Sequence, residues 1–117
     1  VALAALLVVA GLSGCASDGP VRVTSDMAVG DVARGQALTS DLCGGCHAVS
    51  RAGASPMDAA PPLRWISRAY PPSDLQEALA EGIITAHPAM PAFTLEAQDA
   101  ADVIAYLETI QEVSPAR

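Results

Sequence analysis

The feature that most constrains this chain is the motif "CGGCH", which runs from Cys43 to His47. It sets two thiols three positions apart and places an imidazole directly after the second thiol. Such a group of side chains can bind zinc, cycle between dithiol and disulfide, or hold a haem covalently. Each use needs a different surrounding fold, so the rest of the sequence must decide between them.

Zinc binding and thiol redox chemistry both fit the surrounding sequence poorly. A structural zinc site needs four ligands, typically from two such pairs, whereas the only other histidine is His87. The adjacent Cys46 and His47 also cannot easily point at one metal ion. A redox-active pair usually opens a helix after a strand, and here the pair follows a predicted helix in a chain with no convincing strand.

Covalent haem attachment is the use that fits, because Cys-x-x-Cys followed directly by His is the c-type pattern. The spacing lets Cys43 and Cys46 reach two vinyl groups of one macrocycle while the imidazole of His47 turns under the iron. Gly44 and Gly45 leave the backbone free to approach the ring edge. We therefore predict one haem c per chain, with His47 as an iron ligand.

The iron then needs a second ligand on its opposite face. Met90 lies far downstream in a loop flanked by Pro88 and Pro91, where the chain can cross the second face of the ring. Met57 is too close to His47 in sequence, and Met27 falls in a predicted tether. We predict Met90 as the second ligand; the alternatives are His87, which would give a bis-histidine iron, and a Met90 that only fills a gap in the core.

The amino end reads as an export signal. Residues 1–14 contain the uncharged run "VALAALLVVAGL", which has the length of a signal-peptide core and is too short to span a bilayer. The sequence lacks an initial Met and a positive region, so we expect it to be truncated at its start. The last residues of this segment and Cys15, "LSGC", resemble a bacterial lipobox, which predicts a lipoprotein-type signal peptide and lipidation of Cys15. The alternative is an ordinary signal peptide, or a buried apolar segment, with an incidental cysteine.

Lipidation would also explain the odd count of three cysteines, because Cys43 and Cys46 then belong to one motif. The mature protein is expected in the periplasm, held to a membrane by acyl chains rather than by a spanning helix. Residues 15–30 mix small and polar residues with Gly and Pro, and predict a flexible tether.

Residues 31–112 predict a single all-α domain, followed by a short tail at residues 113–117. Asp31 can cap a first helix that ends at the motif. A long loop follows up to Tyr70, with one short helical turn near residues 65–68. Apolar residues expected on one face of the first helix are Val32, Gly35, Leu38 and Leu42.

Two further helices complete the predicted domain. A capping box at Pro72 to Gln76 would open a short helix that stops at Gly82. Thr94 can cap the last helix, which closes before Pro115. Its apolar stripe consists of Ala97, Ala100, Val103, Ile104, Leu107 and Ile110.

Composition agrees with a cofactor in the core and excludes one class of partner. Aromatic residues are only 3% of the chain, so short helices and proline-rich loops lack the material for a protein-only core. The net charge of -7 and the absence of lysine argue against nucleic-acid binding. Eight carboxylates and no arginine lie between Asp74 and Glu112; they could steer a basic or polar partner, or simply form a solvated face.

Together these segments resemble a class I cytochrome c of the short bacterial monohaem kind, over Gly30 to Gln111. The matching segments are "GDVARGQAL", "CGGCH", "PPL", "MPAF" and "DVIAYL". The resemblance implies that Gly35 and Tyr106 touch where the first and last helices cross. It also implies that the carbonyl of Pro61 or Pro62 accepts a hydrogen bond from His47. Residues it suggests for the haem wall are Leu63, Leu75, Leu79, Ile83, Ile84, Phe93 and Leu107.

The chain departs from the family pattern in ways that bear on partners. Leu38 stands where many relatives have an aromatic residue, and the docking lysines of mitochondrial relatives are absent. The identity of the redox partner therefore cannot be carried over from the resemblance. Residues considered for the haem propionates, or alternatively as ordinary surface residues, are Arg64, Trp65, Arg68 and Tyr70.

The expected function is electron transfer by a monomeric, non-enzymatic haem protein that shuttles single electrons between redox proteins. Two strong axial ligands would leave no open position on the iron, and the chain shows no other catalytic constellation. One alternative is a haem c subunit of a membrane oxidase or periplasmic dehydrogenase. Another is a haem-based sensor or peroxidase with a labile ligand at Met90.

Overall fold

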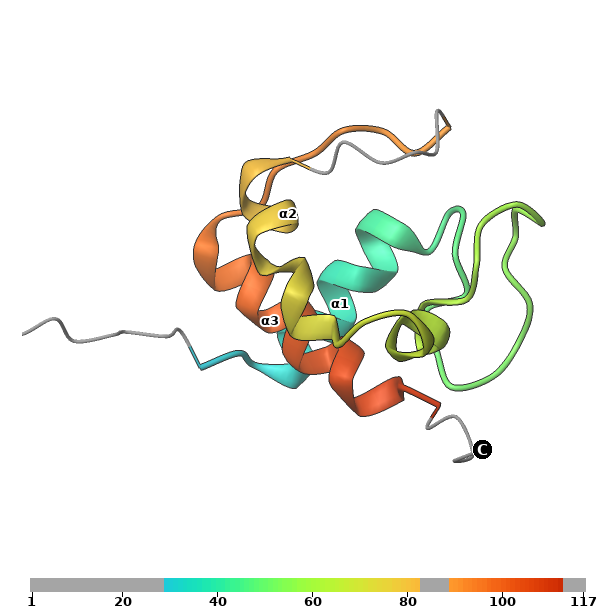
Figure 1. Cartoon of the computed structure of the whole chain (residues 1–117), viewed down its shortest axis with the longest axis horizontal. Helices are drawn as coiled ribbons and strands as arrows, with labels where there is room; N and C mark the ends of the chain where they lie inside the picture. The colour runs from blue at the N-terminus through green and yellow to red at the C-terminus, as the bar shows by residue number, and fades with distance from the viewer. Residues whose placement is uncertain (1–28, 83–88, 113–117) are drawn as a thin grey trace, which may run out of the picture.

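The computed structural model describes residues 29–82 and 89–112, and within these ranges the chain is all-helical with no strand. The helices are α1 (Val32–Cys43), α2 (Leu75–Glu81) and α3 (Ala97–Ile110), and two 3₁₀ turns, η1 (Leu63–Arg68) and η2 (Pro72–Asp74), precede α2. Figure 1 shows α1 and α2 lying against α3, with a long loop leaving the end of α1. The predicted all-α class is confirmed.

Some sequence predictions fall outside the described residues. These are the signal peptide at 1–14, the lipidation site Cys15, the tether except for Val29 and Gly30, the tail at 113–117, and Met27, His87, Ile83 and Ile84. Among the residues that the model describes, no helix is both long enough and apolar enough to span a bilayer.

Helix α1 begins as predicted and buries only part of its predicted face. The Asp31 side chain accepts a hydrogen bond from the Arg34 amide at 2.8 Å, which is a normal N-cap. Of the predicted apolar face, Gly35 is buried and Leu38 packs against the core, whereas Val32 and Leu42 are 44% and 50% exposed. The second buried residue is Thr39, because α1 approaches α3 too closely for large side chains to fit between them.

The close crossing of α1 and α3 depends on Gly35. A Cβ atom at this position would lie 1.8 Å from the Asp102 carbonyl oxygen and 3.0 Å from the Tyr106 Cβ. The contact between Gly35 and Tyr106 implied by the family resemblance is therefore present. Only glycine allows the two helices to meet at this distance.

A buried carboxylate joins the amino-terminal ends of the same two helices. Asp102 is 1% exposed and accepts hydrogen bonds from the Asp31 amide at 2.7 Å and from Gln98 at 2.8 Å. It also pairs with the Arg34 guanidinium, which contacts Asp99 as well. The buried charge is thus neutralised and hydrogen-bonded, as a carboxylate inside a protein must be.

The apolar core lies mostly along α3. Its buried members are Leu79 of α2 and Ala100, Val103, Ile104, Tyr106, Leu107 and Ile110 of α3. Partly buried side chains, among them Leu38, Leu63 and Leu75, pack against this cluster. The core therefore joins α2 and η1 to α3, but it does not extend beneath the motif that ends α1.

Two predicted helix starts are wrong. Residues Pro72–Asp74 form a 3₁₀ turn with no capping bond from a side chain, because Asp74 already has helical dihedral angles. Helix α3 begins at Ala97, after Glu96, rather than after Thr94. The Leu95 amide donates to the Leu79 carbonyl at 2.7 Å, which holds this stretch extended against α2 until the helix starts.

The predicted stop of α2 at Gly82 is confirmed, because Gly82 caps the helix with a φ of +104°.

The long loop after the motif is tied down at several points. The Ala48 amide donates to Ser55 Oγ at 2.9 Å, and the Leu63 amide donates to the Ala48 carbonyl at 2.9 Å. The Tyr106 hydroxyl reaches from α3 to the Val49 carbonyl at 2.7 Å. The two residues that follow His47 are therefore fixed from both the loop and the last helix.

Candidate haem site

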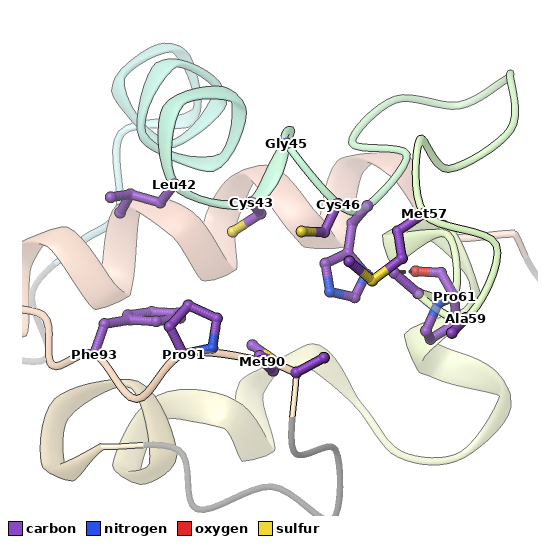
Figure 2. Close-up of a pocket in the computed structure, with 13 residues that line it drawn as sticks. Leu42, Cys43, Gly45, Cys46, Met57, Ala59, Pro61, Met90, Pro91 and Phe93 are labelled. Atoms are coloured by element: carbon purple, nitrogen blue, oxygen red, sulfur yellow. Dashed lines mark hydrogen bonds between the residues drawn. The ribbon is translucent and has the colours of Figure 1, made fainter.

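The end of α1 presents both cysteines to one cleft. Helix α1 ends at Cys43, and the Cys46 and His47 amides both donate to the Cys43 carbonyl, at 3.2 and 2.9 Å. This turn brings the two thiols to the same edge, as Figure 2 shows, and neither thiol is in a disulfide. Burial raises the pKa of the Cys43 thiol, so it stays protonated at neutral pH and lacks the reactive thiolate of a redox pair.

The imidazole of His47 is oriented by a backbone carbonyl. Its Nδ1 lies 2.7 Å from the Pro61 carbonyl oxygen, so Nδ1 carries the proton and donates. The other ring nitrogen, Nε2, is then left with a free lone pair. A hydrogen bond of this kind fixes ring orientation and makes an imidazole a better metal ligand.

The cleft beside these residues is lined mostly by apolar side chains. Its empty space of about 860 Å³ includes the part that is open to solvent. Figure 2 shows Cys43 and Cys46 above the cleft and the segment carrying Met90, Pro91 and Phe93 on the facing side. The remaining lining residues are Leu42, Gly45, His47, Met57, Ala59, Ala60, Pro61 and Ala89.

Two methionines line this cleft, on different sides of it. Met57 belongs to the side of His47, because its amide donates to the Cys46 carbonyl at 3.2 Å. Met90 stands on the facing segment with Pro91 and Phe93, across the cleft from Cys43 and Cys46 (Figure 2). Met57 therefore belongs to the wall that carries the motif, and Met90 to the facing wall.

The residues present fit a covalently attached haem. Two adjacent thiols, an imidazole with its Nδ1 proton engaged, and apolar walls match the needs of a flat macrocycle with a central metal. Within residues 29–82 and 89–112, no group of three or more His, Cys, Asp or Glu side chains could hold a bare metal ion.

A family model described as cytochrome C oxidase, cbb3-type, subunit III matches residues 30–107, which is more than half of the chain. The chain belongs to this family of cytochrome c domains. Membership implies covalent haem c, transfer of electrons to and from redox partners, and a location outside the cytoplasm. The resemblance to cytochrome c is confirmed, and comparisons with curated proteins and with solved structures gave no match.

Not every residue predicted to touch the haem lines the cleft of this cytochrome c domain. Pro61 and Phe93 line it, whereas Pro62 is buried beside a second hollow and Leu63 packs against the core. Leu79 and Leu107 are core residues, and Leu75 packs against them. The Pro61 carbonyl, and not that of Pro62, is the one bound to His47.

Sequence reasoning missed several residues that line the cytochrome's cleft. Three of them are alanines, whose methyl side chains match no motif or apolar pattern in the sequence: Ala59, Ala60 and Ala89. The first two directly precede Pro61. The hydrogen bond from the Met57 amide to the Cys46 carbonyl makes Met57 part of the wall, a position that its sequence spacing from His47 does not indicate. Leu42 also lines the cleft, although its helical spacing predicts a place in the core.

Three of the four residues that the sequence suggests for the haem propionates donate hydrogen bonds to the Glu112 carboxylate instead. Glu112 accepts hydrogen bonds from Arg64 Nε at 2.9 Å, Trp65 Nε1 at 3.0 Å and Arg68 Nη2 at 2.8 Å. Desolvation opposes the charge, but these three donors outweigh it and lower the pKa of Glu112. Neither they nor the exposed Tyr70 line the cleft, so in this structure the group joins η1 to the end of α3.

Proposed function

We propose that this chain is a periplasmic electron carrier with one haem c, whose iron is held between His47 and Met90. The observation that carries the proposal is the hydrogen bond from His47 Nδ1 to the Pro61 carbonyl at 2.7 Å, beside two unbridged cysteines at the edge of an apolar cleft. When bound, the haem supplies a one-electron couple between Fe(III) and Fe(II).

Each side chain would have a distinct part in this function. Cys43 and Cys46 would form thioether bonds that hold the macrocycle against the end of α1. His47 would bind the iron through Nε2, with its basicity raised by the Pro61 carbonyl. The Met90 thioether would favour the reduced iron and so raise the reduction potential.

The apolar lining supports electron transfer over catalysis. Two protein ligands would occupy both axial positions, leaving no place for a substrate on the iron. Met57, Phe93 and the alanines of the cleft offer no acid, base or nucleophile to a reacting molecule. A low-polarity wall would also keep water from the metal.

A spectroscopic redox titration of the holoprotein tests the ligand set. Met90→Ala should lose the near-infrared absorption band of the methionine–iron bond and titrate at a lower potential, because a thioether ligand stabilises Fe(II). The matched control is Met57→Ala, which removes a thioether from the other side of the cleft and should keep both band and potential near wild type. An unchanged spectrum in Met90→Ala would show that Met90 is not an iron ligand and would leave His87 as the candidate for the second ligand.

A second candidate function is a haem-bearing subunit of a membrane oxidase, favoured by the name of the family to which the chain belongs. Such a subunit would leave the membrane together with larger partners. Affinity purification of the tagged native protein, solubilised in mild detergent, decides between the two. A stoichiometric oxidase complex would support the subunit role, and isolation of the free cytochrome would support a carrier.

The membrane attachment of the proposed carrier rests on Cys15. Intact-mass and peptide mass spectrometry of the mature protein should find an acylated Cys15 as the first residue. A mature chain that begins at a later, unmodified residue would contradict the lipid anchor, while leaving the haem proposal untouched.

A further inference from the structure

A second hollow lies between the loop at residues 53–60 and the turn η1. Its empty space of about 750 Å³ includes the part that is open to solvent. It shares only Ala60 with the haem cleft, so a haem bound in the cleft would leave this hollow free. We call it the η1 hollow; its lining side chains larger than alanine are Ser55, Asp58, Pro62, Arg64 and Trp65.

Backbone hydrogen bonds hold the walls of the η1 hollow in place. The Ala48 amide donates to Ser55 Oγ, and the Leu63 amide donates to the Ala48 carbonyl, both at 2.9 Å. The Ala60 amide donates to the Met57 carbonyl at 2.9 Å. The loop and the start of η1 are therefore tied to each other, and a ligand would meet a hollow that is already formed.

One wall of the η1 hollow contains a buried donor that lacks an acceptor. Arg64 is 9% exposed, and its Nε donates to Glu112 at 2.9 Å. Its Nη1 atom is buried and has no hydrogen-bond partner among the described residues. A buried donor without a partner costs free energy, and native proteins normally supply an acceptor for it. Because Arg64 lines the η1 hollow, a ligand seated there would supply that acceptor.

The loop side of the η1 hollow offers two more unused polar groups. Asp58 is exposed, and among the described residues no ion pair or side-chain hydrogen bond involves it. Ser55 Oγ accepts from the Ala48 amide, and its own O–H has no acceptor within the described part of the chain. The η1 hollow thus presents free donors and one free acceptor. A peptide backbone satisfies both kinds of group, because each peptide unit carries a C=O and an N–H.

The only tryptophan of the chain stands in the wall of the η1 hollow and not in the core. Trp65 is 36% exposed, although aromatic residues make up only 3% of the sequence. The Arg68 guanidinium lies 4.3 Å from the centre of its ring, and its Nε1 donates to Glu112 at 3.0 Å. These contacts fix the ring before any partner arrives. Tryptophan and arginine are the residues most enriched among those that dominate binding energy at protein interfaces.

Going beyond the proposed function, we infer that the η1 hollow binds an extended segment of a partner protein, which holds the cytochrome without covering its haem cleft. An apolar side chain of the segment would pack against Trp65 and Pro62. Its backbone C=O would accept from Arg64, and its N–H would donate to Asp58. A lipid surface fits less well, because it is flat and anionic, whereas the η1 hollow is concave and the chain has a net charge of -7.

Photo-crosslinking of the full chain in its native host tests the occupant. The photoreactive residue p-benzoylphenylalanine replaces Ala54, which is exposed and lines the η1 hollow, or Val32, which is exposed on α1 outside it. Illumination should give one discrete adduct from position 54 that is absent from position 32. Peptide mass spectrometry should map this adduct to a single segment of another protein that carries an apolar side chain.

Other crosslinking results would overturn the inference. Adducts with lipid alone would indicate a membrane contact, and adducts with a second copy of this chain would indicate self-association. Equal yields of one adduct from both positions would show that the η1 hollow is not the site of contact. The absence of any adduct from position 54 would show that the η1 hollow has no protein partner.

A synthetic peptide with the sequence of the crosslinked segment then measures the contribution of each group. In calorimetric titrations of the holoprotein, Trp65→Ala should raise the Kd of the peptide about 10-fold or more. Asp58→Asn should raise it about threefold or more, and this exposed substitution gives a result even if Trp65→Ala folds poorly. Asp41→Asn, which changes an exposed carboxylate outside the η1 hollow, is the matched control and should bind as wild type does. Equal affinity of wild type, Trp65→Ala and Asp58→Asn would overturn the inference.

Discussion

At the residue scale, the site depends on a few backbone contacts that orient His47. The Pro61 carbonyl holds Nδ1, and the next two residues along the chain are bonded to Ser55, Leu63 and Tyr106. His47 and both cysteines could be predicted from the sequence, because covalent attachment of haem requires these residues at this spacing. The sequence did not show whether the carbonyl of Pro61 or that of Pro62 bonds to His47. Both residues carry a backbone carbonyl, and the direction of each depends on the path of the whole loop.

The Tyr106 hydroxyl offers a test of this loop. Tyr106→Phe keeps the ring in the core but removes the hydrogen bond to the Val49 carbonyl, so the free energy of unfolding of the holoprotein should fall by about 1 kcal/mol. Denaturant titration measures the change. Tyr70→Phe is the control, because Tyr70 is 44% exposed, and it should have the stability of wild type. Equal stability of the two variants would mean that the Val49 contact contributes nothing.

At the scale of the elements, the crossing of α1 and α3 decides where the motif sits. The sequence predicted the existence of all three helices, because capping at Asp31, the stop at Gly82 and the stripe on α3 are local patterns. It mispredicted the burial of Val32 and Leu42 in α1 and the starts of α2 and α3. Those depend on tertiary contacts: the approach to Asp102 and the bond from Leu95 to Leu79.

Gly35→Ala tests the crossing directly. The added methyl group would lie 1.8 Å from the Asp102 carbonyl, so the helices must separate, at a cost of about 1–3 kcal/mol in unfolding free energy. Gln36→Ala is the matched control, because Gln36 is an exposed residue of the same helix. Thermal or denaturant unfolding of both holoproteins gives the comparison. A stable Gly35→Ala would contradict the close contact.

At the scale of the whole molecule, two groups of polar contacts join other elements to α3, and the apolar core lies mostly along the same helix. Asp102 joins the ends of α1 and α3, and Glu112 joins η1 to the other end of α3. The sequence predicted a missing apolar component from its few aromatic residues. It did not reveal these carboxylates as structural, because each gathers partners from distant parts of the chain.

Acid should destabilise the protein through these two carboxylates. The bond from the Asp31 amide, with help from Gln98 and Arg34, lowers the pKa of Asp102, and the pKa of Glu112 is also lowered. A carboxylate with a lowered folded pKa stabilises the fold above its unfolded pKa of about 4, and this contribution is lost as pH falls through the folded value. The free energy of unfolding should therefore decrease progressively below about pH 4.

Asp102→Asn should weaken the loss of stability in acid. It should also lower stability at neutral pH, because Arg34 then keeps only Asp99 as a charged partner. Asp74→Asn, which changes an exposed carboxylate outside both groups, should keep the wild-type pH profile. Denaturant titrations from neutral pH to pH 3 measure both. An Asp102→Asn profile parallel to wild type would show that Asp102 does not contribute to the pH dependence.

The central claim is that Cys43, Cys46 and His47 hold one haem and make the chain a one-electron carrier. Intact-mass spectrometry combined with a potentiometric titration of the purified protein tests it most directly. The account predicts the mass of one covalently bound haem and a single couple with a slope of about 59 mV per tenfold change in the oxidised-to-reduced ratio. A haem-free mass with a two-electron dithiol couple, whose slope is about 30 mV, would contradict it.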